Sequence, residues 1–125
     1  MPVQFRNPIL FARDMEASKA FYHGLLGIGI KEDFGTFVLL EGNLGLHRAD
    51  LFYEYLQKPY SGEAMGRDNL DLYFTSDHLP ELQERLIAAG FEVFFPLQQT
   101  AWGETLFRVY DPDGHIVEIG DNAHE

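Results

Sequence analysis

The chain has 125 residues and a formal net charge of −11, from nine basic and twenty acidic side chains. Cysteine is absent, which excludes disulfides, thiolate metal sites and cysteine nucleophiles. No apolar run approaches the roughly 18 residues that span a bilayer, and the first residues have no signal-peptide pattern. We therefore expect one soluble, cytoplasmic domain. Its charge repels phosphates and anionic lipid, so we expect neither nucleic acid nor a membrane as a partner.

The first half of the sequence predicts one strand, a helix and three more strands. Asp14 is a favourable N-cap, and Gly27 provides the left-handed residue that often ends a helix. Between them, Ala17, Phe21 and Leu25 recur at helical spacing. The predicted strands are Val3 to Ala12, Gly29 to Asp33, Thr36 to Leu40 and Leu44 to His47.

The second half repeats this order. Asp77 can cap a helix that starts near Asp77 or His78, tolerates Pro80 in its first turn and stops at Gly90. Gly27 follows Asp14 by 13 positions, and Gly90 follows Asp77 by 13. Leu82, Leu86 and Ala89 form the predicted apolar stripe of this helix, the predicted strands are Asp71 to Thr75, Phe91 to Phe95, Thr105 to Tyr110 and Ile116 to Ile119, and Asp111-Pro112-Asp113-Gly114 is a predicted turn.

This repetition predicts an α+β fold of two βαβββ modules within a single domain, residues 1–125. The modules cover about 1–48 and 69–122, and residues 49–68 form a connector that contains Pro59, Gly62 and Gly66. Four aromatic residues lie in the connector: Phe52, Tyr53, Tyr55 and Tyr60. They are expected either to seal the crevice between the modules or to contact a ligand.

A doubled βαβββ module resembles the vicinal-oxygen-chelate superfamily, which includes glyoxalase I, extradiol dioxygenases and fosfomycin- and bleomycin-resistance proteins. The resemblance rests on three stretches that together cover nearly all of the chain except the connector. They are Pro8 to Asp14 with Phe21-Tyr22 and Leu26-Gly27, then Asp71 to Phe74 with Leu86 and Gly90, and Trp102-Gly103 with Phe107 to Gly120.

The resemblance implies that the two modules form curled mixed sheets with a cleft between them. Side chains alternate along a strand, so every second residue faces the cleft. The predicted cleft residues are Asn7, Ile9, Phe11, His47, Asp71, Tyr73, Trp102, Arg108, Tyr110 and Glu118.

Metal-dependent members hold a divalent ion with four cleft residues, usually His or Gln, Glu, His and Glu. By resemblance, the corresponding places in this chain are Asn7, Gly45, Asp71 and Glu118, and only Glu118 matches. We therefore expect no metal and no other cofactor. If a metal binds, Glu118 with Asp71 or His47 would hold it. The other histidines, His23, His78, His115 and His124, are predicted to be solvated surface residues.

Asp71 and Glu118 could form a carboxylate pair for acid–base work, in which repulsion and partial burial raise at least one pKa. Arg108 could instead neutralise Glu118 in a structural ion pair. The sequence leaves both open.

Two functions follow from the resemblance. The first is a metal-independent protein that sequesters a planar, basic, antibiotic-like molecule by stacking and charge attraction, like bleomycin-resistance proteins. The Pro-x-Leu opening and Trp102-Gly103 look most like that branch. The alternative is a metal-dependent lyase, isomerase or dioxygenase of the same superfamily. Relatives commonly pair, so we expect a homodimer.

Overall fold

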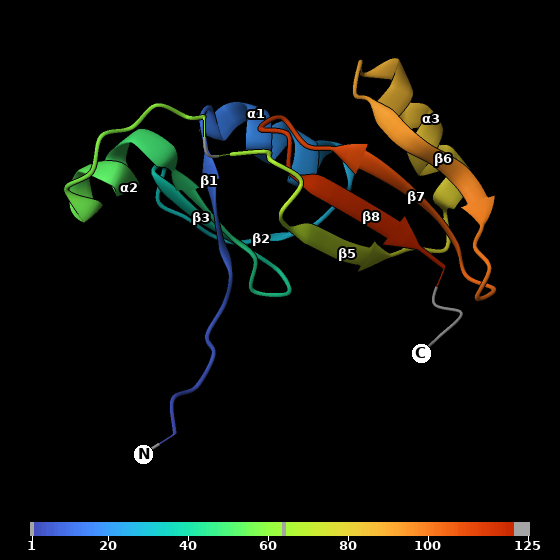
Figure 1. Cartoon of the computed structure of the whole chain (residues 1–125), viewed down its shortest axis with the longest axis horizontal. Coiled ribbons are helices and arrows are strands. Elements are labelled where there is room, and N and C mark those ends of the chain that lie inside the picture. Colours follow the sequence, from blue (N-terminus) through green and yellow to red (C-terminus); the bar gives the residue numbers. More distant parts are fainter. Residues whose placement is uncertain (1, 64, 122–125) are drawn as a thin grey trace. The chain divides into compact units, whose positions relative to one another are not determined.

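The computed structural model describes residues 2–63 and 65–121, which form two compact units, 1–63 and 64–125. Both units have the order strand, helix, three strands, as Figure 1 shows for each by itself. The fold is therefore the predicted α+β arrangement of two βαβββ modules. The elements are β1 (Ile9–Ala12), α1 (Met15–Lys19), η1 (Ala20–Leu25), β2 (Ile30–Asp33), β3 (Phe37–Leu40), β4 (Gly45–Arg48), α2 (Ala49–Leu56), β5 (Asp71–Thr75), α3 (Leu79–Ala88), β6 (Val93–Gln99), β7 (Thr105–Tyr110) and β8 (Ile116–Gly120).

Each unit contains one four-stranded sheet, and the two sheets share one topology. The strand order is β1-β4-β3-β2 in the first and β5-β8-β7-β6 in the second. In each, the first strand pairs in parallel with the last, and the remaining pairs are antiparallel. The last strand of each module therefore lies inside its sheet, beside the first.

The two sheets have separate cores. In the first unit, Phe21 and Tyr22 of η1 are fully buried, together with Val38, Leu40 and Leu46 of the sheet. In the second, Leu86 of α3 and the sheet residues Phe107, Val109, Val117 and Ile119 are fully buried. Burial of such side chains contributes roughly 1.5–3 kcal/mol each, so each sheet is stabilised by its own helix.

The first helix begins and ends at the predicted residues. The Asp14 carboxylate accepts hydrogen bonds from the backbone N–H groups of Glu16 and Ala17. The helix widens to a π-helix in η1, and Gly27 follows in the left-handed region at φ 77°. Its N–H donates to the carbonyl of His23, which closes the helix.

Several elements differ from the prediction. The first strand begins at Ile9 rather than Val3, because Pro8 has no N–H for a sheet ladder. The second strand of the second module, β6, runs from Val93 to Gln99 instead of from Phe91 to Phe95. Residues 49–56 of the expected connector form the helix α2. No helix among the described residues is long and apolar enough to cross a membrane.

The helix of the second module, α3, begins near Asp77 or His78, as predicted. Its N-cap is His78, and no side chain caps its first turn, so the prediction that Asp77 is the cap is wrong. The Ser76 hydroxyl instead accepts from the His78 N–H at 3.0 Å. Leu79 and Leu86 form its buried stripe, whereas Ala89 lies exposed beyond the last helical residue.

Candidate functional site

Alternation along the strands separates a core face from a second face in each sheet. In β1, Leu10 and Ala12 are buried, whereas the neighbouring Ile9 is 40% exposed. In β8, Val117 and Ile119 are buried and Glu118 between them is partly exposed. The predicted site residues on strands therefore lie on the faces turned away from the cores.

The second sheet brings four predicted site residues together. Asp71 and Tyr73 lie on β5, Arg108 on β7 and Glu118 on β8, and the register places Glu118 directly beside both Tyr73 and Arg108. We call the sheet face that bears these four side chains the carboxylate face. It is the face opposite the core that α3 covers.

The Asp71 and Glu118 carboxyl groups lie side by side and share a hydrogen bond. Partial burial, a side-chain hydrogen bond with Glu118 and the charge of Glu118 raise the pKa of Asp71 to about 6, while Arg108 opposes the shift. The pKa rises because burial and the neighbouring Glu118 both favour the neutral, protonated form of Asp71 over its anion. Asp71 can therefore gain or lose a proton near neutral pH.

Arg108 contacts both a carboxylate and a ring. Its Nε donates to Glu118 Oε1 at 2.9 Å, and its guanidinium lies 4.5 Å from the centre of the Phe95 ring. The Glu118 and Arg108 side chains are only 13% and 24% exposed. Glu118 is therefore ion-paired with Arg108 and also hydrogen-bonded to Asp71.

A buried carboxylate that the sequence analysis missed joins two predicted aromatic residues. Glu104, only 5% exposed, accepts from the Tyr73 hydroxyl and from the Trp102 indole N–H. Gly120 leaves the space for this contact, because a Cβ at that position would lie 2.6 Å from Glu104 Oε2. Tyr73 and Trp102 are nevertheless 51% and 57% exposed, so their rings remain available for contact. No sequence motif identified Glu104. It follows the turn between β6 and β7, and it is one of twenty acidic residues in the chain.

Tyr110 is engaged within its own module. Its ring stacks on Phe94 with centres 4.3 Å apart, and its hydroxyl donates to Asp68 at 3.1 Å. Partial burial and that hydrogen bond raise the pKa of Tyr110. The Tyr110 ring therefore packs against the protein itself, and the ring face that contacts Phe94 is not available to stack on a ligand.

In the first module, Phe11 and His47 lie in an aromatic cluster with α2. Phe52 lies 4.7 Å from Phe11 and 4.9 Å from His47, and Tyr53 lies 5.6 Å from Phe11. The α2 rings thus cover one end of the first sheet, so the two connector rings Phe52 and Tyr53 have a packing role within this module. His47 also has its Nδ1 3.0 Å from the Arg48 carbonyl oxygen.

The residues at the superfamily's metal places do not fit a metal ion. In the first module, Gly45 has no side chain to offer, and Asn7 offers only an amide oxygen, which is a poor ligand for a transition metal. In the second module, Glu118 has the Arg108 guanidinium as its counter-charge and shares a hydrogen bond with Asp71. The positive charge that a metal ion would place beside Glu118 is therefore already provided by Arg108.

The remaining histidines have varied environments. His23 and His78 are exposed, as expected, and His124 lies outside the described residues. His115 is not a solvated residue, because its Nε2 is buried and has no hydrogen-bond partner among residues 2–63 and 65–121. Its ligand atoms and those of Asp111 and Asp113 lie within 4.8 Å of one another. However, Asp111 Oδ1 already accepts the N–H groups of Asp113 and His115, as a turn carboxylate does.

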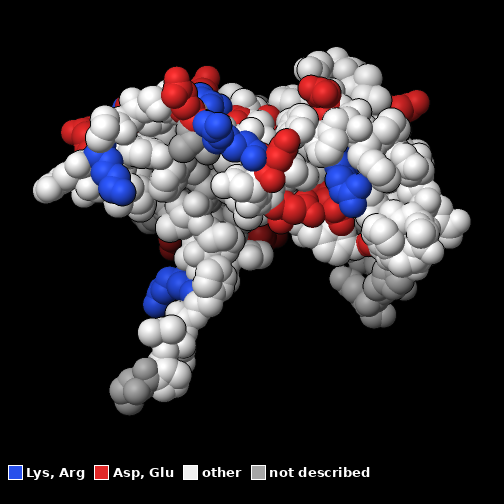
Figure 2. Space-filling model, viewed as in Figure 1, with Lys and Arg blue, Asp and Glu red and all other residues white. Residues whose placement is uncertain are grey.

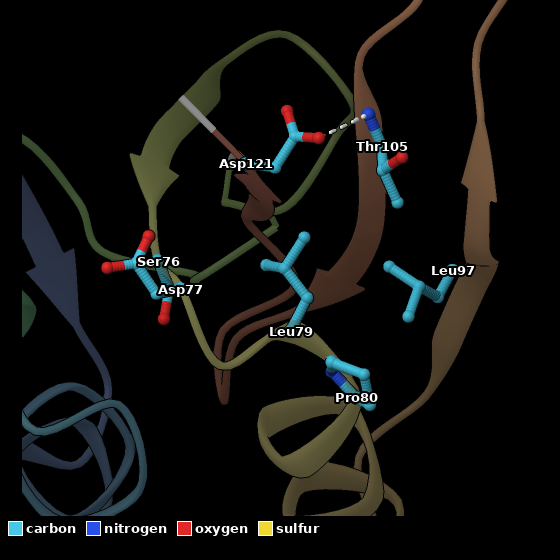
Figure 3. Close-up of a pocket in the computed structure, with 7 residues that line it drawn as sticks. All are labelled: Ser76, Asp77, Leu79, Pro80, Leu97, Thr105 and Asp121. Carbon is cyan, nitrogen blue, oxygen red and sulfur yellow. Dashed lines mark hydrogen bonds between the residues drawn. The ribbon is translucent and has the colours of Figure 1, made fainter. Parts of the chain in front are cut away.

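A cavity of about 490 Å³ in the second module contains none of the predicted site residues. Figure 3 shows the residues around it. Leu79 and Pro80 come from the start of α3, and Asp121 accepts a hydrogen bond from the N–H of Thr105, at the start of β7. Thr105 lies on the same face of β7 as the buried Phe107 and Val109, so this cavity is on the α3 side of the sheet and not on the carboxylate face. Its lining residues are Ser76, Asp77, Leu79, Pro80, Leu97, Thr105 and Asp121.

Comparison with known families agrees with this architecture. The sequence model of the glyoxalase-like domain matches residues 5–124, nearly the whole chain. The chain belongs to the glyoxalase-like family. This places it in the vicinal-oxygen-chelate superfamily, which the repeated module predicted. Among curated proteins, no significant match is found.

Solved structures of similar proteins extend the comparison. A protein of unknown function from Agrobacterium tumefaciens str. C58 is 42% identical, with a TM-score of 0.86 and coverage of 97% of this chain and 95% of that one. A glyoxalase-related enzyme from Fulvimarina pelagi is 27% identical, with a TM-score of 0.78 and coverage of 95% and 88%. A glyoxalase/bleomycin resistance protein/dioxygenase family enzyme from Burkholderia phytofirmans PsJN shares the fold at 23% identity, a TM-score of 0.75 and coverage of 93% and 96%.

Proposed function

We propose that this chain binds a planar, positively charged small molecule on the carboxylate face, without a metal ion. The observation that carries the proposal is the Asp71–Glu118 pair beside the exposed ring of Tyr73. Above a pH of about 6, two carboxylates face one guanidinium, which leaves a negative charge on this face. A cationic guest would neutralise that charge.

The aromatic residues give the guest its shape. Tyr73 and Trp102 have exposed rings. Glu104 fixes their orientation by accepting hydrogen bonds from the Tyr73 hydroxyl and the Trp102 indole N–H. Stacking on such rings contributes about 0.5–1.5 kcal/mol beyond area burial, and a cation over a ring adds a similar amount. Sequestration of an antibiotic-like compound would follow from such binding, and bleomycin is a natural first probe because structural relatives carry that name.

The test is a titration with bleomycin and with the planar cation proflavine, followed by calorimetry and by the fluorescence of Trp102, the single tryptophan. We expect saturable binding that weakens at high salt. The double variant Asp71→Asn, Glu118→Gln should bind at least tenfold more weakly. Glu84→Gln, which removes an exposed carboxylate on α3, is the matched control and should leave binding unchanged. Equal loss in the control would refute a specific role for the carboxylate face.

The second candidate is an enzyme of the same superfamily, a lyase, isomerase or dioxygenase. The raised pKa of Asp71 favours it, because a carboxyl group that titrates near 6 suits general acid–base catalysis. Metal analysis after exposure to nickel, zinc and manganese, with glyoxalase and extradiol dioxygenase assays, separates the two. Metal-dependent turnover lost in Glu118→Gln would replace the binding proposal with this one.

A further inference from the structure

We propose that the first module holds a separate binding site for a small monocarboxylate with an apolar body. The site is a cavity of about 480 Å³, within the usual range for small-molecule pockets of roughly 300–1,000 Å³. This inference does not rest on the function proposed above, because it uses other residues and the opposite charge. The cavity is lined by Arg6, Asn7, Lys31, Glu32, Phe37, Leu39 and Asn43.

Four segments of the module meet at this cavity. Arg6 and Asn7 precede β1, Lys31 and Glu32 lie on β2, and Asn43 lies in the turn before β4. The floor comes from β3, where Phe37 and Leu39 alternate with the fully buried Val38 and Leu40. The cavity therefore lies on the sheet face turned away from the core.

Two cations make this cavity unusual in an acidic chain. The sequence has only nine basic residues, and on the face drawn in Figure 2 they lie in small separate groups. Arg6 and Lys31 both line the cavity, and within the described part of the chain neither forms an ion pair. Lys19, Arg48 and Arg108, in contrast, each have a carboxylate partner.

The polar groups are placed to receive an oxyanion. Lys31 Nζ donates to Asn43 Oδ1 at 3.2 Å, which orients the ammonium and leaves its other two N–H donors for a ligand. A guanidinium such as that of Arg6 can bind both oxygens of a carboxylate. With Glu32 present, the charge of the lining sums to a single positive unit, which favours a monoanion over a phosphate dianion.

An apolar body on the ligand matches the floor of the cavity. The Phe37 ring and the Leu39 side chain are only partly buried by the protein itself. Gly45 keeps the floor open, because a Cβ there would lie 3.1 Å from both the Phe37 ring and Asn7 Nδ2. Any larger residue would displace two lining side chains.

The experiment is a titration of the whole chain with benzoate and 3-phenylpropionate, followed by calorimetry and ligand-observed NMR. We expect both acids to bind, phenyl phosphate to bind more weakly, and benzylamine and benzyl alcohol not to bind. The double variant Arg6→Gln, Lys31→Gln should weaken binding at least tenfold, and Glu32→Gln should strengthen it several-fold. All three side chains are exposed, so these variants should fold, and their thermal midpoints verify this.

Two controls isolate the site. Lys58→Gln removes an exposed cation elsewhere in the same module and should leave the affinity unchanged. Arg48→Gln, which removes a cation already paired with Asp50, should also leave it unchanged. The proposal is overturned if neither acid binds, if the Arg6 and Lys31 variant binds as well as the original chain, or if Lys58→Gln weakens binding equally.

Discussion

The two oxygens of the buried Glu104 carboxylate hold two different rings. Oε1 accepts from the Trp102 indole at 3.1 Å, and Oε2 accepts from the Tyr73 hydroxyl. Because Glu104 is only 5% exposed, water cannot replace either contact fully. One acidic residue thus fixes an aromatic ring on β5 and another in the β6–β7 turn.

Glu104→Gln should destabilise the chain by about 1–3 kcal/mol, because an amide offers one acceptor oxygen where two donors converge. Urea unfolding measures the change, and the Trp102 emission should shift to the red as its indole is released. Tyr73→Phe and Trp102→Phe each remove only one donor and should cost less than Glu104→Gln. An unchanged unfolding midpoint in Glu104→Gln would contradict this role.

Gly120→Ala should disturb the same contact. The added methyl would lie 2.6 Å from Glu104 Oε2 and 2.9 Å from the Tyr73 hydroxyl oxygen. Such overpacking costs about 1–3 kcal/mol. Gly24→Ala is the matched control, since nothing lies within 4 Å of its Cβ and alanine is the better helix former, so stability should hold or rise. Equal destabilisation by both substitutions would argue against a specific clash at Gly120.

The carboxyl pair predicts how stability depends on pH. Asp71 holds its proton more tightly in the folded chain, with a pKa of about 6, than at its ordinary value of 3.8. Between these values the folded Asp71 binds more protons than the unfolded one, so the contribution of Asp71 to the free energy of unfolding falls as pH rises from about 4 to about 6. Asp71→Asn should flatten this slope in denaturation curves measured at intervals of pH. A slope that is unchanged in the variant would count against the raised pKa.

Arg108→Gln tests the ion pair with Glu118. It leaves a carboxylate that is 13% exposed without its cation and removes the charge that lowers the pKa of Asp71. We expect a clear loss of stability and a further rise in the Asp71 pKa, measured by carboxyl carbon NMR. Arg48→Gln breaks the exposed pair with Asp50 and should cost only about 0–1 kcal/mol. Similar costs in both variants would show that burial does not matter here.

Much of the fold could be predicted because local signals agree with the module. Asp14 and Gly27 bound the first helix, and Asp71 to Thr75 and Thr105 to Tyr110 are strands with the expected limits. The helix α2 was missed, because flanking Pro59 and Gly62 are typical of a loop. Its stability comes from ring contacts with Phe11 and His47 that only the folded sheet provides.

The site was predicted in part for a related reason. Alternation identifies which residues share a face, so the grouping of Asp71, Arg108 and Glu118 follows from strand order. Glu104 follows the turn between β6 and β7, where no periodicity indicates direction, and its burial depends on the missing side chain of Gly120. The cation-lined cavity was missed as well, since Arg6 precedes the first strand and Asn43 lies in a turn.

The exposed first residues give the expected homodimer a testable contact. The Val3 and Phe5 side chains are 96% and 83% exposed and lie two positions apart in the chain. Two apolar side chains so close together and so exposed suit a contact surface. We expect a second copy of the chain to cover them, and light scattering after size exclusion should give twice the chain mass. Val3→Ser with Phe5→Ser should shift the mass towards one chain, whereas Phe34→Ser, another exposed ring, should not. A monomer before any substitution would contradict the expectation.

Each sheet also has a glycine on its last strand, Gly45 in one and Gly120 in the other, and its own buried core on the opposite side. Substitutions of exposed side chains on either of these two faces therefore leave the buried core of the same sheet intact. A chain organised in this way can acquire cationic chemistry in one half and acidic chemistry in the other by independent steps. Diversification of ligands within such a scaffold then requires few compensating changes, which makes the repeated module a tolerant starting point for new specificities.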